Sequence, residues 1–142
     1  MMKIDGSCHC GALAYEAEID PEKVGVCHCV DCQILSGGAF RTGATAPEGA
    51  FKITHGTAKI YVKDTDAGGR REMGFCGDCG THIYSAPPGD ARKQYRVRVA
   101  TARQRDQLPP TRQIWMRSAQ TWLTDLAGLP GEAKQSPAAV SD

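Results

Sequence analysis

The amino-acid sequence predicts a mainly β protein, built from small antiparallel sheets and completed by a short helix near the C-terminus. Short segments in which apolar and polar residues alternate recur between turns rich in glycine and proline, as in strands with one exposed face. No convincing long helix separates these segments, so βαβ units with a parallel sheet are disfavoured. All seven cysteines fall into three tight groups, which indicates that bound metal organises the fold.

The predicted strands follow one another closely along the chain. In the segment 13–19, Leu13, Tyr15, Ala17 and Ile19 alternate with small or charged residues, as in a half-buried strand. Similar patterns predict further strands at 39–45, 51–54, 59–62, 70–75, 81–84 and 94–101. The breaks between them contain Gly37-Gly38, Gly68-Gly69 and Pro87-Pro88-Gly89, whose backbone preferences suit turns. We therefore expect antiparallel sheets.

The pattern changes after Pro109-Pro110, where the extended region ends. Apolar residues then recur with helical spacing, which predicts a short helix over 117–126. The residues that carry this spacing are Ile114, Trp115, Ser118, Trp122 and Leu126. We expect Trp115 and Trp122 to cover the core. Beyond Gly128 the sequence is small, polar and proline-containing, so residues 1–127 are predicted to form one zinc-binding domain and 128–142 a flexible tail.

Length and charge restrict the possible functions. A chain of 142 residues suits one domain, and its formal net charge of +1 provides no global field toward nucleic acid or a membrane surface. The first residues offer no apolar stretch that could act as a signal peptide, and no uncharged run approaches ~18 residues. We expect a cytoplasmic protein with reduced thiols and no nucleic-acid or membrane partner.

Basic residues are nevertheless concentrated in one segment. Within positions 92–105 lie Arg92, Lys93, Arg96, Arg98, Arg103 and Arg105, and Asp106 is the only acidic residue nearby. Such a local cluster suits a small anionic ligand better than a duplex, while a solvated strand face is the alternative interpretation.

The cysteines could form disulfides or bind metal, and their spacing favours metal. The groups are Cys8-His9-Cys10, the run 27–32 (Cys-His-Cys-Val-Asp-Cys) and Cys76-Gly77-Asp78-Cys79. Seven is an odd number, and cysteines one or two residues apart are poorly placed for the geometry of a disulfide. A cytoplasmic setting also keeps thiols reduced.

The cysteines divide naturally into a set of four and a set of three. Cys76 and Cys79 supply half of a site from one tight turn, and Cys8 with Cys10 is the natural second pair. This pairing leaves Cys27, Cys29 and Cys32 as a local tripod. A closed structural zinc site has four protein ligands, whereas a catalytic site has three and one exchangeable position. We expect two Zn²⁺ ions per chain, one structural and one catalytic.

The tripod suggests a particular kind of substrate. Three thiolates leave a bound Zn²⁺ with a formal charge of −1, which makes it a weak Lewis acid and favours a soft sulfur ligand over phosphate or carboxylate. The alternatives are a tripod closed by one of the four histidines, an empty reduced tripod, or an iron–sulfur cluster. The cluster is disfavoured because the usual cysteine run followed by Cys-Pro is missing. His9 and His28 are expected to point away from the metals.

These motifs resemble a known family. The stretches 6–12, 27–37 and 75–81 look like those of the glutathione-dependent formaldehyde-activating enzyme (GFA) family, which includes the centromere protein V group. The resemblance covers about Gly6 to Trp122. It implies the β-tent zinc fold, with a structural zinc on the four-cysteine set and a catalytic zinc on the tripod.

The resemblance also implies an activity. The family enzyme is a carbon–sulfur lyase that joins glutathione and formaldehyde into S-(hydroxymethyl)glutathione, so the implied partners are a small thiol and a small aldehyde. Arg41, Arg96 and Arg98 are candidates for binding the two glutathione carboxylates. Gln113 stands where relatives often have a histidine, and segment 101–106 also differs from many relatives; we expect both in the pocket wall.

Two alternatives accompany this hypothesis. The chain could be a related enzyme that acts on another thiol or aldehyde. It could also be a non-catalytic binding or scaffold protein stabilised by zinc, because a fold does not determine a function. In that case the tripod would belong to a closed zinc site without an exchangeable position, and the basic segment would bind an acidic partner.

Overall fold

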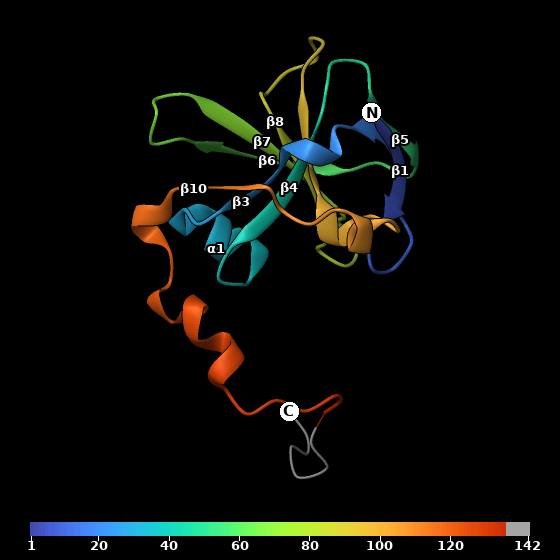
Figure 1. The fold of residues 1–142 in the computed structure, drawn as a ribbon. Helices are drawn as coiled ribbons and strands as arrows, with labels where there is room; N and C mark the ends of the chain where they lie inside the picture. The colour runs from blue at the N-terminus through green and yellow to red at the C-terminus, as the bar shows by residue number, and fades with distance from the viewer. Residues whose placement is uncertain (136–142) are drawn as a thin grey trace.

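The computed structural model describes residues 1–135, which form two β-sheets and several short helices. The smaller sheet has the strand order β1-β2-β5, and the larger has the order β10-β3-β4-β9-β8-β7-β6 (Figure 1). The strands are β1 Met2–Ser7, β2 Ala14–Ile19, β3 Val24–Cys27, β4 Arg41–Ala46, β5 Phe51–His55, β6 Lys59–Asp64, β7 Arg70–Phe75, β8 His82–Ala86, β9 Tyr95–Arg98 and β10 Arg112–Ile114. The prediction of a mainly β fold with small sheets is confirmed.

The core lies between the two sheets. In β2, Tyr15, Ala17 and Ile19 are buried while the intervening glutamates are exposed, as the alternation predicts. The larger sheet contributes the row Val24, Ala44, Val97 and Tyr84, whose members are paired across β3, β4, β9 and β8. Phe51 of the smaller sheet joins the two sides by contacting Tyr84 and Tyr95 of the larger sheet, with ring centroids 5.2 Å and 4.4 Å apart.

Strand pairing is antiparallel except at one edge. β10 lies parallel to β3, and Ile114 is aligned with Cys27. This pairing brings a late segment of the chain beside residues 24–27, which the alternation pattern did not identify as a strand. As a consequence, residues 112–114 form one edge of the larger sheet, beside β3.

A helix that the sequence did not predict follows β3. Helix α1, Val30–Ser36, begins after Cys29, whose backbone is extended and whose sulfur accepts a hydrogen bond from the Cys32 N–H. It ends at Gly37, where φ is 69° and the backbone N–H bonds back to the last turn. Gly37-Gly38 is therefore the end of a helix and not only a turn between strands.

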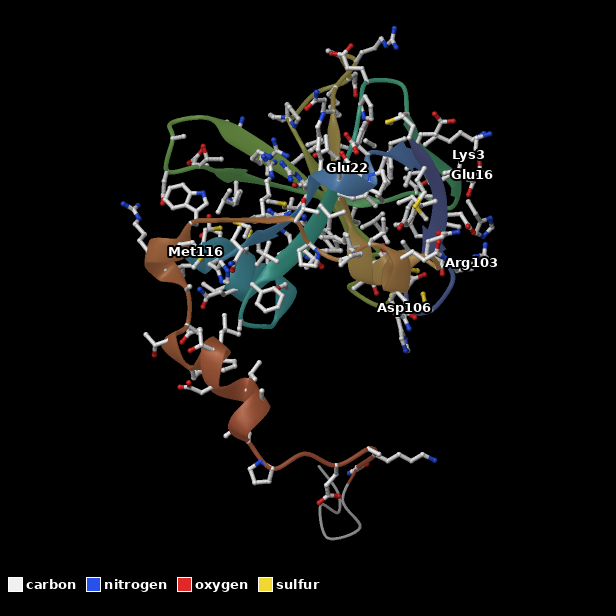
Figure 2. The ribbon with its side chains drawn as sticks, in the orientation of Figure 1. Lys3, Glu16, Glu22, Arg103, Asp106 and Met116 are labelled. Atoms are coloured by element: carbon white, nitrogen blue, oxygen red, sulfur yellow. The ribbon has the colours of Figure 1, made fainter. Side chains whose placement is uncertain are left out.

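The C-terminal segment is helical but of the 3₁₀ type. The short helices are η1 Pro21–Lys23, η2 Val99–Thr101, η3 Arg105–Gln107, η4 Met116–Ser118 and η5 Thr121–Gly128. Met116 lies where the chain turns away from the sheet, and η5 extends outward from there (Figure 2). The prediction that Trp115 and Trp122 cover the core is wrong, because their exposed fractions are 36% and 48%.

Two further expectations concern the ends of the molecule and membranes. Of the predicted tail 128–142, residues 136–142 lie outside the described part, and 129–135 contain no helix or strand. Within residues 1–135, no helix has the length and apolar character needed to cross a bilayer.

Candidate functional site

Four cysteines gather at the tips of two hairpins. Cys8 and Cys10 lie in the connection between β1 and β2, and Cys76 and Cys79 in the connection between β7 and β8. All four sulfurs lie within 4.8 Å of one another, with 3.7 Å between Cys8 and Cys10 and 3.8 Å between Cys10 and Cys76. Tetrahedral Zn–S bonds of ~2.3 Å would separate sulfurs by about 3.8 Å. The donor set therefore fits a tetrahedral thiophilic ion.

The two hairpin tips have matching backbone hydrogen bonds. The Cys8 N–H donates to the Leu13 carbonyl and the Cys76 N–H donates to the Thr81 carbonyl, both at 2.9 Å. The Leu13 N–H also donates to the Cys8 sulfur at 3.2 Å. On the other hairpin, a hydrogen bond with the Thr81 side chain lowers the pKa of Cys79 to about 5. The hydrogen bonds at Cys8 and Cys79 thus favour the thiolate form of these two residues.

This four-cysteine cluster joins the two sheets. One hairpin belongs to the smaller sheet and the other to the larger. Cys8 and Cys76 are buried within the hydrophobic core, while Cys10 and Cys79 are exposed. An ion held here would cross-link residues that lie ~65 positions apart in the chain, a placement that suits stabilisation.

The other three cysteines lie on the opposite side of the larger sheet. Cys27 ends β3, Cys29 precedes α1, and Cys32 lies in the first turn of that helix. Their sulfurs are also within 4.8 Å of one another. Among the described residues, no histidine or carboxylate joins this group, so the tripod supplies three ligands and no fourth.

The tripod has an asymmetric charge distribution. The Arg41 Nε donates to the Cys32 sulfur at 3.1 Å. The hydrogen bond with Cys27, followed by the charge of Arg41, lowers the pKa of Cys32 to about 4. The same contact, together with burial, raises the pKa of Cys27. The Arg41 guanidinium thus favours negative charge on the Cys32 sulfur over the other two sulfurs of the tripod.

The tripod opens into a pocket of about 470 Å³. Its walls come from α1, β4, β6, β7, β8 and β9, from the turn 65–67, and from the end of β10 with the segment that follows it. Ile114 and Trp115 form an apolar wall, and Trp115 has a left-handed backbone with φ of 57°, which is strained for a bulky residue. The Arg117 guanidinium lies over the Trp115 ring at 4.9 Å and holds it in place.

Arginines line the pocket on the sheet side. Arg41, Arg96 and Arg98, which the sequence suggested as carboxylate partners, all contribute to its wall, together with Arg71. Burial, followed by the positive charge of Arg41, lowers the pKa of Arg98 to about 9. The sequence alone did not single out Arg71, because its position depends on how β7, β8 and β9 pair.

The other polar residues considered from the sequence lie elsewhere. His28 points away from the tripod and its Nε2 forms a 2.8 Å hydrogen bond with the side-chain oxygen of Gln113, on the far side of β3. The expectation that Gln113 lines the tripod pocket is therefore wrong, because alternate residues of β10 face opposite sides. Segment 101–106 is also outside this pocket. Its Arg103, labelled in Figure 2, donates a hydrogen bond to the carboxylate of Asp5 in β1.

Comparison with known proteins gives a consistent result. The family model described as "Glutathione-dependent formaldehyde-activating enzyme" matches residues 3–118. An uncharacterized lyase of Schizosaccharomyces pombe is 29% identical over 86 residues, which are 61% of this chain and 59% of the yeast protein. The match thus spans less than two thirds of that relative. A crystal structure of a Rhodobacter sphaeroides protein has a similar fold, with a TM-score of 0.59 and 24% identity over 77% of this chain and 98% of that one.

Proposed function

Because the chain belongs to the glutathione-dependent formaldehyde-activating enzyme family, we propose that it is a zinc-dependent carbon–sulfur lyase that joins a thiol to a small aldehyde. Its substrates would be glutathione and formaldehyde, and its product S-(hydroxymethyl)glutathione. The observation that carries this proposal is the tripod of Cys27, Cys29 and Cys32, which offers three ligands at the edge of an open pocket.

The two cysteine clusters would have different tasks. Cys8, Cys10, Cys76 and Cys79 would hold a structural Zn²⁺ between the hairpins, and Cys27, Cys29 and Cys32 a catalytic Zn²⁺. A zinc ion on three thiolates supplies a position where a substrate thiol loses its proton. The burial of Cys8 and Cys76 and the location of the tripod in a pocket wall support this division.

The residues of the pocket would arrange the reactants. Arg41 holds the Cys32 sulfur, which orients one ligand of the tripod. The apolar side chains of Ile114 and Trp115 limit access of water from one side, so that the small aldehyde is held next to the sulfur. The substrate sulfur then forms a bond to the aldehyde carbon. The electron pair of the C=O π bond moves to oxygen, which takes up a proton equivalent to the one lost by the thiol.

The location and partners of the protein follow from this reaction. Glutathione and formaldehyde are small cytoplasmic metabolites, so we place the protein in the cytoplasm. Neither nucleic acid nor a membrane is required as a partner.

NMR exchange spectroscopy tests the proposal. Formaldehyde and S-(hydroxymethyl)glutathione are equilibrated with and without the zinc-loaded protein, and the exchange rate is compared with that of the Cys29→Ser variant. We expect the native chain to accelerate exchange and the variant to leave the spontaneous rate unchanged. An equal rate with and without native protein would refute this reaction and favour another thiol, another aldehyde or a binding role.

A further inference from the structure

One face of the larger sheet carries four arginines around the tripod pocket. They are Arg41 on β4, Arg71 on β7, and Arg96 and Arg98 on β9. Arg96 and Arg98 are two positions apart and therefore project from the same face. The register places Arg96 opposite Ser85 of β8, and Arg71 reaches the same serine with its Nη2, 3.2 Å from the hydroxyl. The guanidinium groups thus converge from three strands.

These arginines have no carboxylate partners among residues 1–135. The ion pairs of that part of the chain involve other cations. The hydrogen bonds that the cluster does form go to weak or neutral acceptors: Arg41 to the Cys32 sulfur, Arg71 to the Ser85 hydroxyl, and Arg98 to the Met73 sulfur at 3.6 Å. Most of the donor capacity of the cluster is therefore unused.

Arg98 is the most unusual member. Its exposed fraction is 8%, and its Nη1 has no hydrogen-bond partner among the described residues. A buried cation without a counter-charge is strongly destabilising, and proteins rarely keep one unless something compensates it. Because Arg98 lines the pocket, the missing partner would come from a molecule bound there.

Glycines in the sheet make room for this arrangement. Gly43 lies opposite Arg98 in the register and beneath the stem of Arg96. A Cβ at position 43 would lie 2.8 Å from Cγ and Cδ of Arg96 and 2.7 Å from Nη1 of Arg41, closer than carbon contacts allow. Gly25, the neighbour of Gly43 on β3, also lies beneath these arginine side chains, with Arg96 Nη1 3.6 Å from a Cβ placed there. The backbone is thus shaped to hold arginines in contact with the sheet.

The negative charge of the cysteine tripod does not balance the positive charge of the arginines that line the pocket. Three thiolates and a Zn²⁺ would have a net charge of −1, and Arg41 already contacts one of the sulfurs. The pocket wall also contains Asp31, which pairs with Lys63, and Asp66. Three arginines then face a single remaining carboxylate, which leaves two positive charges without compensation.

We propose that Arg71, Arg96 and Arg98 form an anion-binding subsite that receives an oxyanion group of the substrate. The proposal deepens the proposed function, on which it rests for the identity of the reacting thiol. It defines the substrate class as thiols that carry a carboxylate, sulfonate or phosphate, with the sulfur directed to the tripod and the anion to β9. Neutral thiols would lack the anchor that positions their sulfur.

Calorimetric titration with succinate, sulfate and phosphate at constant ionic strength tests the subsite without thiol or aldehyde. The relative affinities of the three probes distinguish a carboxylate site from one for a sulfur or phosphorus oxyanion. We expect binding to the native chain and about tenfold weaker binding to Arg96→Gln, since one charge-assisted hydrogen-bond partner is lost. Arg105→Gln removes the same charge from an exposed position outside the pocket and is expected to bind as the native chain does.

A second variant separates the effect of arginine side-chain position from the effect of net charge. Gly43→Ala retains every arginine but displaces Arg96 and Arg41, so it is also expected to weaken binding while the net charge is unchanged. The proposal is overturned if none of the three anions binds at millimolar concentration, or if Arg96→Gln and Arg105→Gln bind equally well. Anion binding without accelerated formaldehyde exchange would refute only the proposed reaction, and accelerated exchange without anion binding would refute only the subsite.

A thiol series tests the substrate class. With zinc-loaded protein, 3-mercaptopropionate and 2-mercaptoethanesulfonate are compared with 2-mercaptoethanol, which has no anionic group. We expect at least one anionic thiol to bind about tenfold more tightly than the neutral one, and Arg96→Gln to reduce that preference. Equal binding of all three thiols would contradict the assignment.

Discussion

At the scale of single residues, cysteine occurs in two different environments in this protein. Cys8 and Cys76 are part of the hydrophobic core, where the hairpin backbones hold them in position. Cys27 and Cys32 are also buried, but they border a pocket lined with cations. Loss of a ligand should therefore affect folding in one cluster and the pocket in the other.

Substitution of single cysteines should separate the two metal sites. We expect Cys27→Ser to lose one of two Zn²⁺ ions per chain and to remain folded, whereas Cys8→Ser should unfold because the cross-link between the hairpins is broken. Metal analysis and far-ultraviolet circular dichroism measure the two effects. If both variants simply unfold, the division into a structural and a catalytic site is wrong.

The residues of the site were only partly predictable from the sequence. The two cysteine sets could be predicted because local spacing and ligand count limit how they group. Arg71 and Trp115 could not, since their positions in the pocket depend on strand register and on the parallel pairing of β10. The basic segment 92–105 was recognised, yet only Arg96 and Arg98 of its members reach the tripod pocket.

At the scale of elements, β1 is tied to the segment after β9 by one carboxylate. Asp5 accepts hydrogen bonds from Arg103 and from the Gln104 amide at 2.8 Å, and its backbone N–H donates to the Gln104 side chain at 3.1 Å. The hydrogen bond from Gln104, followed by that from Arg103, lowers the pKa of Asp5 below its ordinary value of 3.8. Two elements ~100 residues apart are connected in this way.

This connection predicts a pH dependence of stability. Because the pKa of Asp5 is lower in the folded state, its ionised carboxylate stabilises the fold above pH ~4. This stabilisation is lost as the pH falls through the folded-state pKa. We expect Asp5→Asn to reduce the free energy of unfolding by about 1 kcal/mol at pH 6 and by less at pH 3. Urea unfolding at both pH values measures this, with the exposed Asp106→Asn as the charge-matched control.

Close contact between β7 and β8 gives a second prediction at this scale. A Cβ on Gly74 would lie 2.2 Å from Cε1 of the buried Tyr84 ring, which has little space to move. We expect Gly74→Ala to destabilise the fold by about 2 kcal/mol or more. Gly69→Ala, in the turn between β6 and β7, has only a Thr65 contact at 3.6 Å and should change stability by less than ~0.5 kcal/mol. Equal effects in denaturant titrations would contradict this account.

The sequence predicted most of the strands but did not predict β1, β3, β10 or helix α1. Most strands from β2 to β9 lie within a few residues of the predicted segments. β3 and β10 contain four and three residues, too few for a periodic signal, and they depend on pairing with partners. Helix α1 has only two turns, and its end at Gly37-Gly38 resembles an ordinary turn in the sequence.

At the scale of the whole molecule, the two sheets and their shared core determine which segments of the chain can be removed without loss of stability. The last helix, η5, has no buried residue, and Leu129 beyond it is 61% exposed. We expect a chain that ends at residue 127 to melt within ~2 °C of the full chain, because residues 128–135 are all exposed. Calorimetry measures the difference. A decrease of more than ~5 °C would show that the C-terminal residues stabilise the domain.

The parallel pairing of β10 with β3 has a consequence for the order of assembly during synthesis. The tripod is complete once residue 32 has been made, but its apolar wall requires Ile114 and Trp115, ~80 residues later. At ~5–20 residues per second, the ribosome takes about 4 to 16 s to supply them. A nascent chain therefore presents its three thiols for several seconds before Ile114 and Trp115 are available to line one side of the pocket.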